Sequence, residues 1–153
     1  MRRSAGLLLY RGSPPHLEVM LVHPGGPFWA RRDEGAWTIP KGEFTEGESP
    51  LQAARREFRE ETGGDVDGPF HALQPARLAS GKRLHAFAVR ADFDPAAFVS
   101  NTFIIEWPPR SGRMQSFPEV DRADWFGLEE AARKLHPAQR AWLAELVDWR
   151  AST

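Results

Sequence analysis

The sequence predicts a single α/β domain, because short apolar runs typical of strands precede and follow one clearly bounded helix, and two further helical segments end the chain. The 153 residues suit one domain. A chain of this length can bury about 70% of the surface that it exposes when unfolded. No internal repeat, low-complexity tract or long linker divides it, so we expect residues 1–153 to fold as one unit.

Composition narrows the classes of function. The net charge of −1 gives no general attraction for nucleic acid or for an anionic membrane. The chain has no cysteine, which excludes disulfides, thiolate zinc sites and cysteine nucleophiles. The five histidines form no pair at metal-ligand spacing, so catalytic zinc is not expected. The first apolar run, which Tyr10 and Arg11 interrupt, is too short for a signal peptide or a membrane span, so we expect a cytoplasmic protein.

Strand and helix signals follow one another along most of the chain. We expect strands at 5–10, 17–22, 70–79, 84–89, 103–107 and 122–126, and helices at 129–135 and 138–149. Residues 37–42 are expected to be a short extended piece, and residues 110–117 an exposed loop. The last helix carries Trp142, Leu146 and Trp149 on one stripe, which packs on the domain or on a second subunit. The sequence therefore leaves open whether the protein forms a homodimer.

The helix that follows residue 49 has the clearest boundaries in the sequence. Ser49 and Gln52 have the spacing of a capping box, and Pro50 occupies the first helical position. Gly63 and the glycine after it supply the stop, since glycine accepts the left-handed conformation of a helix C-terminus. The stripe expected to be buried consists of Leu51, Ala54 and Phe58.

This helix also carries a cluster of carboxylates. Glu57 stands three and four residues before Glu60 and Glu61, so the three side chains share one face. Because like charges repel, a bound hard divalent cation is the usual compensation. The apolar stripe points elsewhere, so the helix can pack on a sheet and still present carboxylates to a cleft. The alternative is a solvated helix face on which Arg56 pairs with Glu60.

The segment 42–64 resembles the signature of the Nudix hydrolases, G-x5-E-x7-R-E-U-x-E-E-x-G-U, in which U is a bulky apolar residue. The matching residues are Gly42, Glu48, Arg56, Glu57, Phe58, Glu60, Glu61 and Gly63. Gly64 departs from the pattern, which affects the packing of the loop after the helix. Residues 100–126 more weakly resemble a little-characterised bacterial branch described as predicted nucleoside triphosphate pyrophosphohydrolases. The resemblance implies an α/β/α sandwich with a mixed, partly curled sheet.

The resemblance also implies a metal site and the residues that form it. Magnesium or manganese would neutralise phosphate oxygens, orient a water molecule and lower its pKa, and carboxylate oxygens suit these hard cations. Glu57 and Glu61 would be the principal ligands, with Glu60 as a further ligand and the carbonyl oxygen of Gly42 completing the set. Arg56, which belongs to the catalytic motif, would form a salt bridge with Glu48.

Residues outside this motif are candidates for the remaining roles. Lys41 could contact a substrate phosphate, or could be a solvated lysine in a turn. Glu119 could bind metal or accept the proton of the attacking water, with Glu106 and the glutamates of the motif as competing general bases. Arg110 and Arg113 could hold substrate phosphates, or could belong to an ordinary charged loop.

These observations predict an enzyme that cleaves a phosphoanhydride bond in a nucleoside diphosphate-linked compound by attack of water. A nucleoside triphosphate or a dinucleoside polyphosphate is the expected small-molecule substrate. One alternative is a binding module that senses a nucleotide without cleaving it. Another is an enzyme that removes pyrophosphate from an RNA 5′ end, which the near-neutral charge and the lack of a long basic run make less attractive, so no nucleic-acid partner is expected.

Overall fold

A computed structural model describes residues 3–152 of the chain. The strands of the main sheet are β1 (Arg3–Arg11), β2 (Glu18–Pro24), β3 (Lys41–Phe44), β4 (His71–Ala72), β5 (Ala76–Arg77), β6 (Arg83–Arg90) and β9 (Val120–Gly127), and a separate pair is formed by β7 (Thr102–Glu106) and β8 (Met114–Pro118). The helices are α1 (Pro50–Thr62), α2 (Leu128–Lys134) and α3 (Ala141–Ala151), with short 3₁₀ turns at η1 (Pro95–Ala97) and η2 (Pro137–Gln139).

The main sheet is mixed, and its central strand changes partner along its length. β1 runs parallel to β6 from Arg3 to Tyr10 along one edge. Along its other edge β1 pairs antiparallel with β3 through residues 3–6 and with β2 at residues 10–11. Gly6 in β1 lies opposite Lys41, the first residue of β3. A Cβ atom on Gly6 would stand 2.1 Å from the carbonyl oxygen of Pro40. A glycine at this position therefore allows the chain before β3 to approach β1 closely, at the point where β1 changes its partner on this edge.

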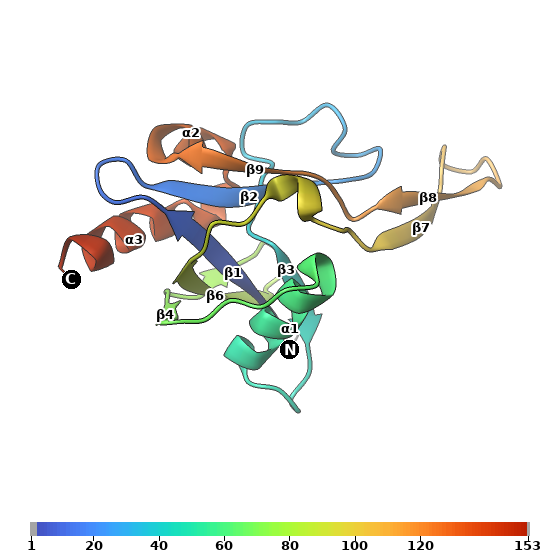
Figure 1. Ribbon diagram of the computed structural model, residues 1–153. Coiled ribbons are helices and arrows are strands. Elements are labelled where there is room, and N and C mark those ends of the chain that lie inside the picture. The colour runs from blue at the N-terminus through green and yellow to red at the C-terminus, as the bar shows by residue number, and fades with distance from the viewer. Residues whose placement is uncertain (1–2, 153) are drawn as a thin grey trace.

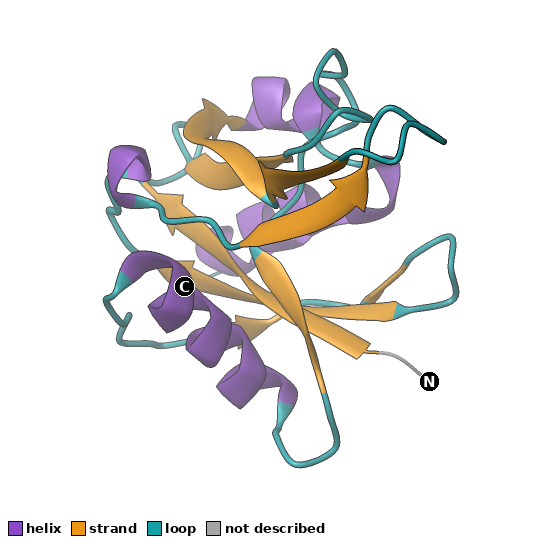
Figure 2. Cartoon of the chain, turned by 90° about the vertical axis from the view of Figure 1, so that its right-hand side faces the viewer, coloured by secondary structure: helices purple, strands orange, loops and turns teal. Residues whose placement is uncertain are grey.

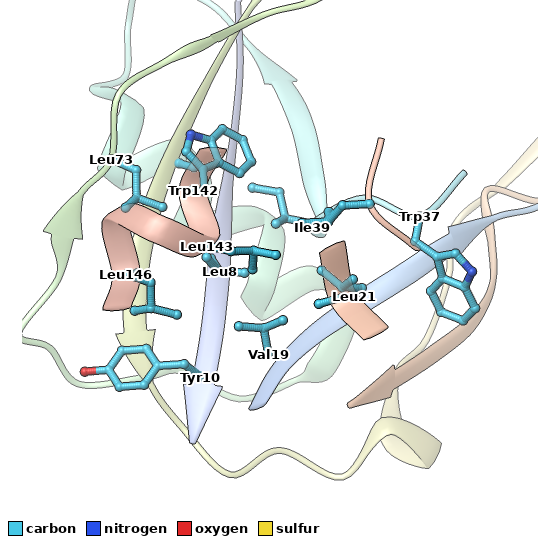
Figure 3. Packing of buried hydrophobic residues seen from close by; sticks show 14 of the residues in the cluster. Leu8, Tyr10, Val19, Leu21, Trp37, Ile39, Leu73, Trp142, Leu143 and Leu146 are labelled. Atoms are coloured by element: carbon cyan, nitrogen blue, oxygen red, sulfur yellow. The ribbon is translucent and has the colours of Figure 1, made fainter. Parts of the chain in front are cut away.

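Helices cover the two faces of the sheet (Figures 1 and 2). α1 packs its buried residues Ala53, Ala54 and Phe58 into one apolar cluster. α3 packs Trp142, Leu143 and Leu146 into the cluster on the opposite face, which Figure 3 shows in close-up. Successive β1 side chains alternate between the two clusters, as expected for a strand that is buried on both faces. The predicted α/β/α sandwich with a mixed sheet is confirmed.

Three expectations about individual elements are wrong in detail. The strand predicted at 70–79 is two short strands, β4 and β5, because both pair with β6 across a break that contains Pro75. The loop predicted at 110–117 is a strand from Met114 onward, since β8 pairs with β7 in continuous register. The last helix begins at Ala141 and not at 138, because Pro137 starts a separate 3₁₀ turn.

The two-stranded sheet β7–β8 projects from the body of the molecule, and we call residues 102–118 the arm (Figure 1). Its root lies where Pro118 and Glu119 lead into β9, and its tip is the turn at 107–113. The apolar stripe of α3 is buried within its own chain, with Trp149 stacked on His71 at a centroid distance of 4.4 Å. No helix within residues 3–152 is both long and apolar enough to cross a membrane.

Candidate active site

α1 has the capped structure that its sequence predicts. The Gln52 N–H donates to Ser49 Oγ at 3.1 Å, and the Ser49 N–H donates to Gln52 Oε1 at 2.9 Å, which completes the capping box. Gly63 ends the helix with a φ of 74°, and its N–H donates to the carbonyl oxygen of Arg59. Because both ends are fixed and one face is buried, the carboxylates on the other face have a defined position.

β3 lies against the carboxylate face of α1, and Gly42 is the point of closest approach. A Cβ atom on Gly42 would stand 2.1 Å from Glu57 Cδ and within 2.5 Å of both carboxylate oxygens. Any larger residue would have to displace the Glu57 carboxylate. The first glycine of the motif is therefore explained by packing: its backbone leaves the space that the Glu57 carboxylate fills.

Arg56 joins the loop before α1 to the carboxylate face. Its Nε and Nη2 donate to the two Glu48 carboxylate oxygens at 2.8 and 3.0 Å, a bidentate geometry. Its Nη1 lies 3.0 Å from Glu57 Oε1 and 3.4 Å from Glu60 Oε1. The hydrogen bond to Arg56 lowers the pKa of Glu48, and the same bond is the main reason that the pKa of Arg56 is raised. The Glu48–Arg56 pair implied by the resemblance is thus present.

Glu61 is the most unfavourably placed carboxyl group of this cluster. Its residue is only 7% exposed, and its Oε1 atom is buried without a hydrogen-bond partner. Burial, followed by the like charges of Glu57, Glu119 and Glu60, raises the pKa of Glu61 to about 8. Burial also raises the pKa of Glu57, against the opposing effect of Arg56. A buried carboxylate without a partner is costly, and a cation beside it would remove the cost.

Glu119 and Lys41 approach this cluster from two other segments. The charge of Glu119 raises the pKa of Glu61 and that of Lys41 lowers it. Glu119 lies in the bend between β8 and β9, and its backbone is held by the carbonyl oxygen of Asn101 and by the N–H of Gly25, each at 2.8 Å. Lys41 is open to solvent on one side, yet desolvation by the surrounding protein, and then the charge of Lys82, lower its pKa.

The donor atoms suit a hard divalent cation, but they do not converge on one position in this structure. The side chains of α1 and Glu119 offer oxygen atoms, and the orphaned Glu61 Oε1 has no other partner. Within residues 3–152 no three histidine, aspartate or glutamate side chains already converge at metal-binding geometry. Glu57 is instead held by Arg56. The site thus offers oxygen donors that suit a divalent cation, with Glu57 and Glu60 engaged by an arginine.

The arm carries three predicted residues away from this cluster. Glu106 accepts hydrogen bonds from the N–H groups of Arg110 and Gly112 at 3.0 and 3.2 Å, so its carboxylate closes the turn at the tip. Arg110 and Arg113 are exposed at this tip, which projects beyond α1 (Figure 1). The structure therefore brings Glu119 to the carboxylates of α1 and leaves Glu106, Arg110 and Arg113 at the far end of the arm.

One contact at the site has no signal in the sequence. The N–H of Val99 donates to the carbonyl oxygen of Glu61 at 2.7 Å, so the segment that leads into β7 is fastened to the last turn of α1. Because the bond uses backbone atoms only, no residue type marks it.

A hollow of about 870 Å³, lined by residues that include His16, Glu18 and Leu128, lies between the β1–β2 turn and α2 and contains none of the predicted site residues.

A mixed sheet between helices that presents hard oxygen donors beside a lysine has the groups that a metal-dependent hydrolase of phosphoanhydrides uses. A model of the NUDIX domain matches residues 1–149, and the chain belongs to the NUDIX domain family. The family and the assignment to pyrophosphohydrolases that the sequence predicts are confirmed. Members of this family generally need a divalent metal ion and act on nucleotides.

The proteins similar to this chain carry names of more than one activity, and the solved structure shows a likeness of fold alone. The chain is 30% identical to an octanoyltransferase of Myxococcus xanthus over 135 residues, which are 87% of this chain but only 33% of that protein. It is 29% identical to an RNA pyrophosphohydrolase of Rhizobium meliloti, with 87% of this chain and 90% of that protein covered. The fold matches a C. elegans Ap4A hydrolase over 100% of both chains, with a TM-score of 0.67 and 21% identity.

Proposed function

We propose that this chain binds Mg²⁺ or Mn²⁺ through Glu57, Glu60 and Glu61, with Glu119 and the carbonyl oxygen of Gly42 nearby, and hydrolyses a phosphoanhydride bond of a nucleoside polyphosphate. The observation that carries the proposal is Glu61, a buried carboxyl group with an orphaned oxygen and a pKa of about 8. When bound, the cation supplies charge neutralisation at the phosphate oxygens and a more acidic water molecule.

The residues around the cation have separate tasks in this proposal. Arg56 holds Glu57 and the loop at Glu48, so the carboxylate face stays in position as substrate arrives. Lys41 offers a positive charge to a substrate phosphate beside Glu61. Glu119, exposed and close enough to act on the pKa of Glu61, accepts the proton of the attacking water. A glutamate of the motif is the competing acceptor.

The metal site is tested by Glu61→Gln and Glu57→Gln, with Glu46→Gln as the matched control on an exposed loop position. We expect hydrolysis of the best substrate to fall at least about 100-fold in the first two variants, because a neutral amide is a poor ligand for a hard cation. The control should keep wild-type turnover. Far-ultraviolet circular dichroism checks folding. Wild-type turnover in both site variants would refute the proposed metal site, whereas binding without hydrolysis by the wild type would favour a nucleotide sensor.

The general base is tested by comparing Glu119→Gln with Glu106→Gln. Both substitutions remove one exposed carboxylate, but Glu119 lies beside Glu61 while Glu106 closes the turn at the tip of the arm. We expect kcat to fall about 100-fold in the first variant and to stay within about twofold in the second. Equal losses, or a loss in Glu106→Gln alone, would assign the proton to another group.

Two substrates remain candidates. A nucleoside triphosphate or dinucleoside polyphosphate follows from the near-neutral charge of the chain. An RNA 5′ end is favoured by relatives named RNA pyrophosphohydrolase, of which two are covered over 90% and 86% of their length. Release of phosphate or pyrophosphate from a panel of free nucleotides and from 5′-triphosphorylated RNA, with products identified by mass, decides between them. A homodimer and a cytoplasmic location also remain proposals, and sedimentation velocity tests the first.

A further inference from the structure

The large apolar side chains that are exposed within residues 3–152 gather around the arm. They are Phe28, Val99, Ile104 and Met114, with exposed fractions of 57%, 66%, 69% and 64%. Two of them lie on the strands of the arm, Val99 precedes β7, and Phe28 contacts Trp107. Such a concentration beside a candidate active site indicates a surface that binds something.

The two faces of the arm have different surroundings. Phe103 approaches Gly26 so closely that a Cβ atom there would stand 2.7 Å from its ring, and Trp107 meets Phe28 edge-on at 5.2 Å. These residues therefore face the loop between β2 and β3. Because side chains alternate along a strand, Ile104 lies on the opposite face of the arm, away from this loop.

Met114 extends the apolar surface of Ile104. Ile104 pairs with Ser116 and Glu106 pairs with Met114, so Ile104 and Met114 are diagonal neighbours on one face of the sheet. From Thr102 at the root to Glu106 at the tip the arm rises four residues, which is about 14 Å at the usual rise of a strand. Ile104 lies halfway, about 7 Å from the root.

The root of the arm is joined to the carboxylate site by backbone hydrogen bonds. Val99 donates to the carbonyl oxygen of Glu61 at 2.7 Å, and Glu119 donates to that of Asn101 at 2.8 Å. Val99 therefore lies at the site, and Ile104 and Met114 follow farther out along the arm. A substrate whose phosphates lie at the carboxylates has its remaining part available to contact these side chains.

Resting on the proposed function, we propose that Val99, Ile104 and Met114 bind the nucleobase of the nucleotide whose phosphoanhydride bond is hydrolysed. A nucleobase is a flat group with apolar faces, and it is the part of such a substrate that gains from leaving water. The surface is too small for a stable subunit interface, which needs about 800 Å² from each partner. The same base chemistry is present in a free nucleotide and in the 5′-terminal nucleotide of RNA.

The proposal is tested by binding, which requires no turnover. The ligands are a methylene-bridged nucleoside triphosphate and inorganic triphosphate, titrated with Mg²⁺ into wild type, the double variant Ile104→Ser/Met114→Ser, and the control Phe28→Ser on the other face. We expect the double variant to bind the nucleoside triphosphate about tenfold more weakly and inorganic triphosphate unchanged. The control should stay within about twofold for both ligands.

Two results would overturn the proposal: unchanged affinity for the nucleoside triphosphate in the double variant, or an equal loss for both ligands. A change of oligomeric state in sedimentation velocity, with nucleotide affinity kept, would overturn it in favour of a subunit interface. Failure of the proposed function is recognised separately, because the wild type would then hydrolyse no nucleotide, or Glu61→Gln would keep wild-type turnover, whatever the two variants show in binding.

Arg110 and Arg113 distinguish the two sources of the base. They lie at the tip, beyond Ile104, where a mononucleotide has no phosphate but a continuing RNA chain does. If the source is RNA, Arg110→Gln/Arg113→Gln should raise KM for a 5′-triphosphorylated RNA about tenfold and leave that for a nucleoside triphosphate unchanged. Unchanged KM for both substrates would reject the RNA source and support the free nucleotide.

Discussion

α1 and the arm both border the candidate site, but they are built in opposite ways. α1 has one face in the apolar core and both ends capped, so its carboxylates are held in place even where burial and mutual repulsion disfavour their charge. The arm is a two-stranded sheet that leaves Ile104 and Met114 exposed on one face. A sheet of two strands has little stability of its own.

This difference suggests how the work is divided. Metal chemistry needs ligands at fixed positions, and a helix packed on a sheet provides them at the cost of a strained carboxyl group. Recognition of the rest of the substrate needs accessible side chains, and a projecting arm provides those at the cost of exposed apolar surface. Mutations in α1 and in the arm should therefore differ in whether they disturb fixed ligands or accessible contacts.

The largest effect is expected where β3 touches α1. Gly42→Ala would place a Cβ atom 2.1 Å from Glu57 Cδ, so the carboxylate must move away from its position beside Arg56. We expect kcat/KM to fall at least about 100-fold with little loss of secondary structure. Gly47→Ala is the matched control, since nothing lies within 4 Å of its added Cβ atom. Equal activity in the two variants would contradict the proposed role of Gly42.

Glu61 should make stability depend on pH when no metal is present. The pKa of Glu61 is about 8 in the folded protein, against an ordinary value of 4.5, so between these pH values the folded state binds one more proton than the unfolded state. The contribution of Glu61 to the free energy of unfolding is therefore fully present below about pH 4.5. It is lost as pH rises to about 8, by about 1.4 kcal/mol per pH unit within that window. Urea unfolding in chelator across this range measures the decline.

Glu61→Gln supplies the comparison for this decline. The variant should lose the pH dependence and be more stable than wild type at pH 8 in chelator. Magnesium should raise the stability of wild type more than that of the variant, because it binds the ionised carboxylate. A wild type whose stability is flat from pH 5 to pH 8 would show that the Glu61 carboxyl group is better solvated than its burial indicates.

The arm should open independently of α1. Trp107→Ala removes the edge-on contact with Phe28 that supports the tip. We expect amide exchange in residues 102–106 and 114–118 to become about tenfold faster, while amides of α1 keep wild-type protection. Phe28→Ala should give a similar but smaller effect, because it removes the same contact but leaves the larger Trp107 ring on the arm. Uniform acceleration over both regions would mean that the arm is part of the same cooperative unit as α1.

The same contrast governs what the sequence predicts. The boundaries of α1, the Glu48–Arg56 pair and the position of Gly42 follow from local spacing and from a motif with many fixed positions. The strand Met114–Pro118 was missed because its residues are polar or exposed and its partner β7 lies across a turn. Alternation signals a strand only where one face is buried, and in β8 Phe117 alone is partly buried, whereas β7 alternates and was predicted. The link of Val99 to Glu61 uses backbone atoms and leaves no pattern.

The smallest predicted effect concerns the one residue that departs from the motif. Gly64 stands where the motif has a bulky apolar residue, and it lines a hollow of about 250 Å³ whose walls include Phe58, Val66 and Phe93. The nearest atom to a Cβ on Gly64 is Thr62 Oγ1, at 3.9 Å. Gly64→Val should therefore raise the unfolding free energy by about 1 kcal/mol, through apolar burial and a less flexible unfolded chain.

The neighbouring glycine provides the control for this prediction. Gly63 has a φ of 74°, so Gly63→Val should lower the unfolding free energy by at least about 1 kcal/mol, although nothing lies within 4 Å of its Cβ position. Urea unfolding of the two variants at one pH gives the comparison. Opposite signs would show that the end of α1 needs glycine at 63 for its backbone and tolerates a side chain at 64. Destabilisation by both would mean that the hollow beside Phe58 must stay open, and kcat/KM of Gly64→Val would then show whether substrate uses it.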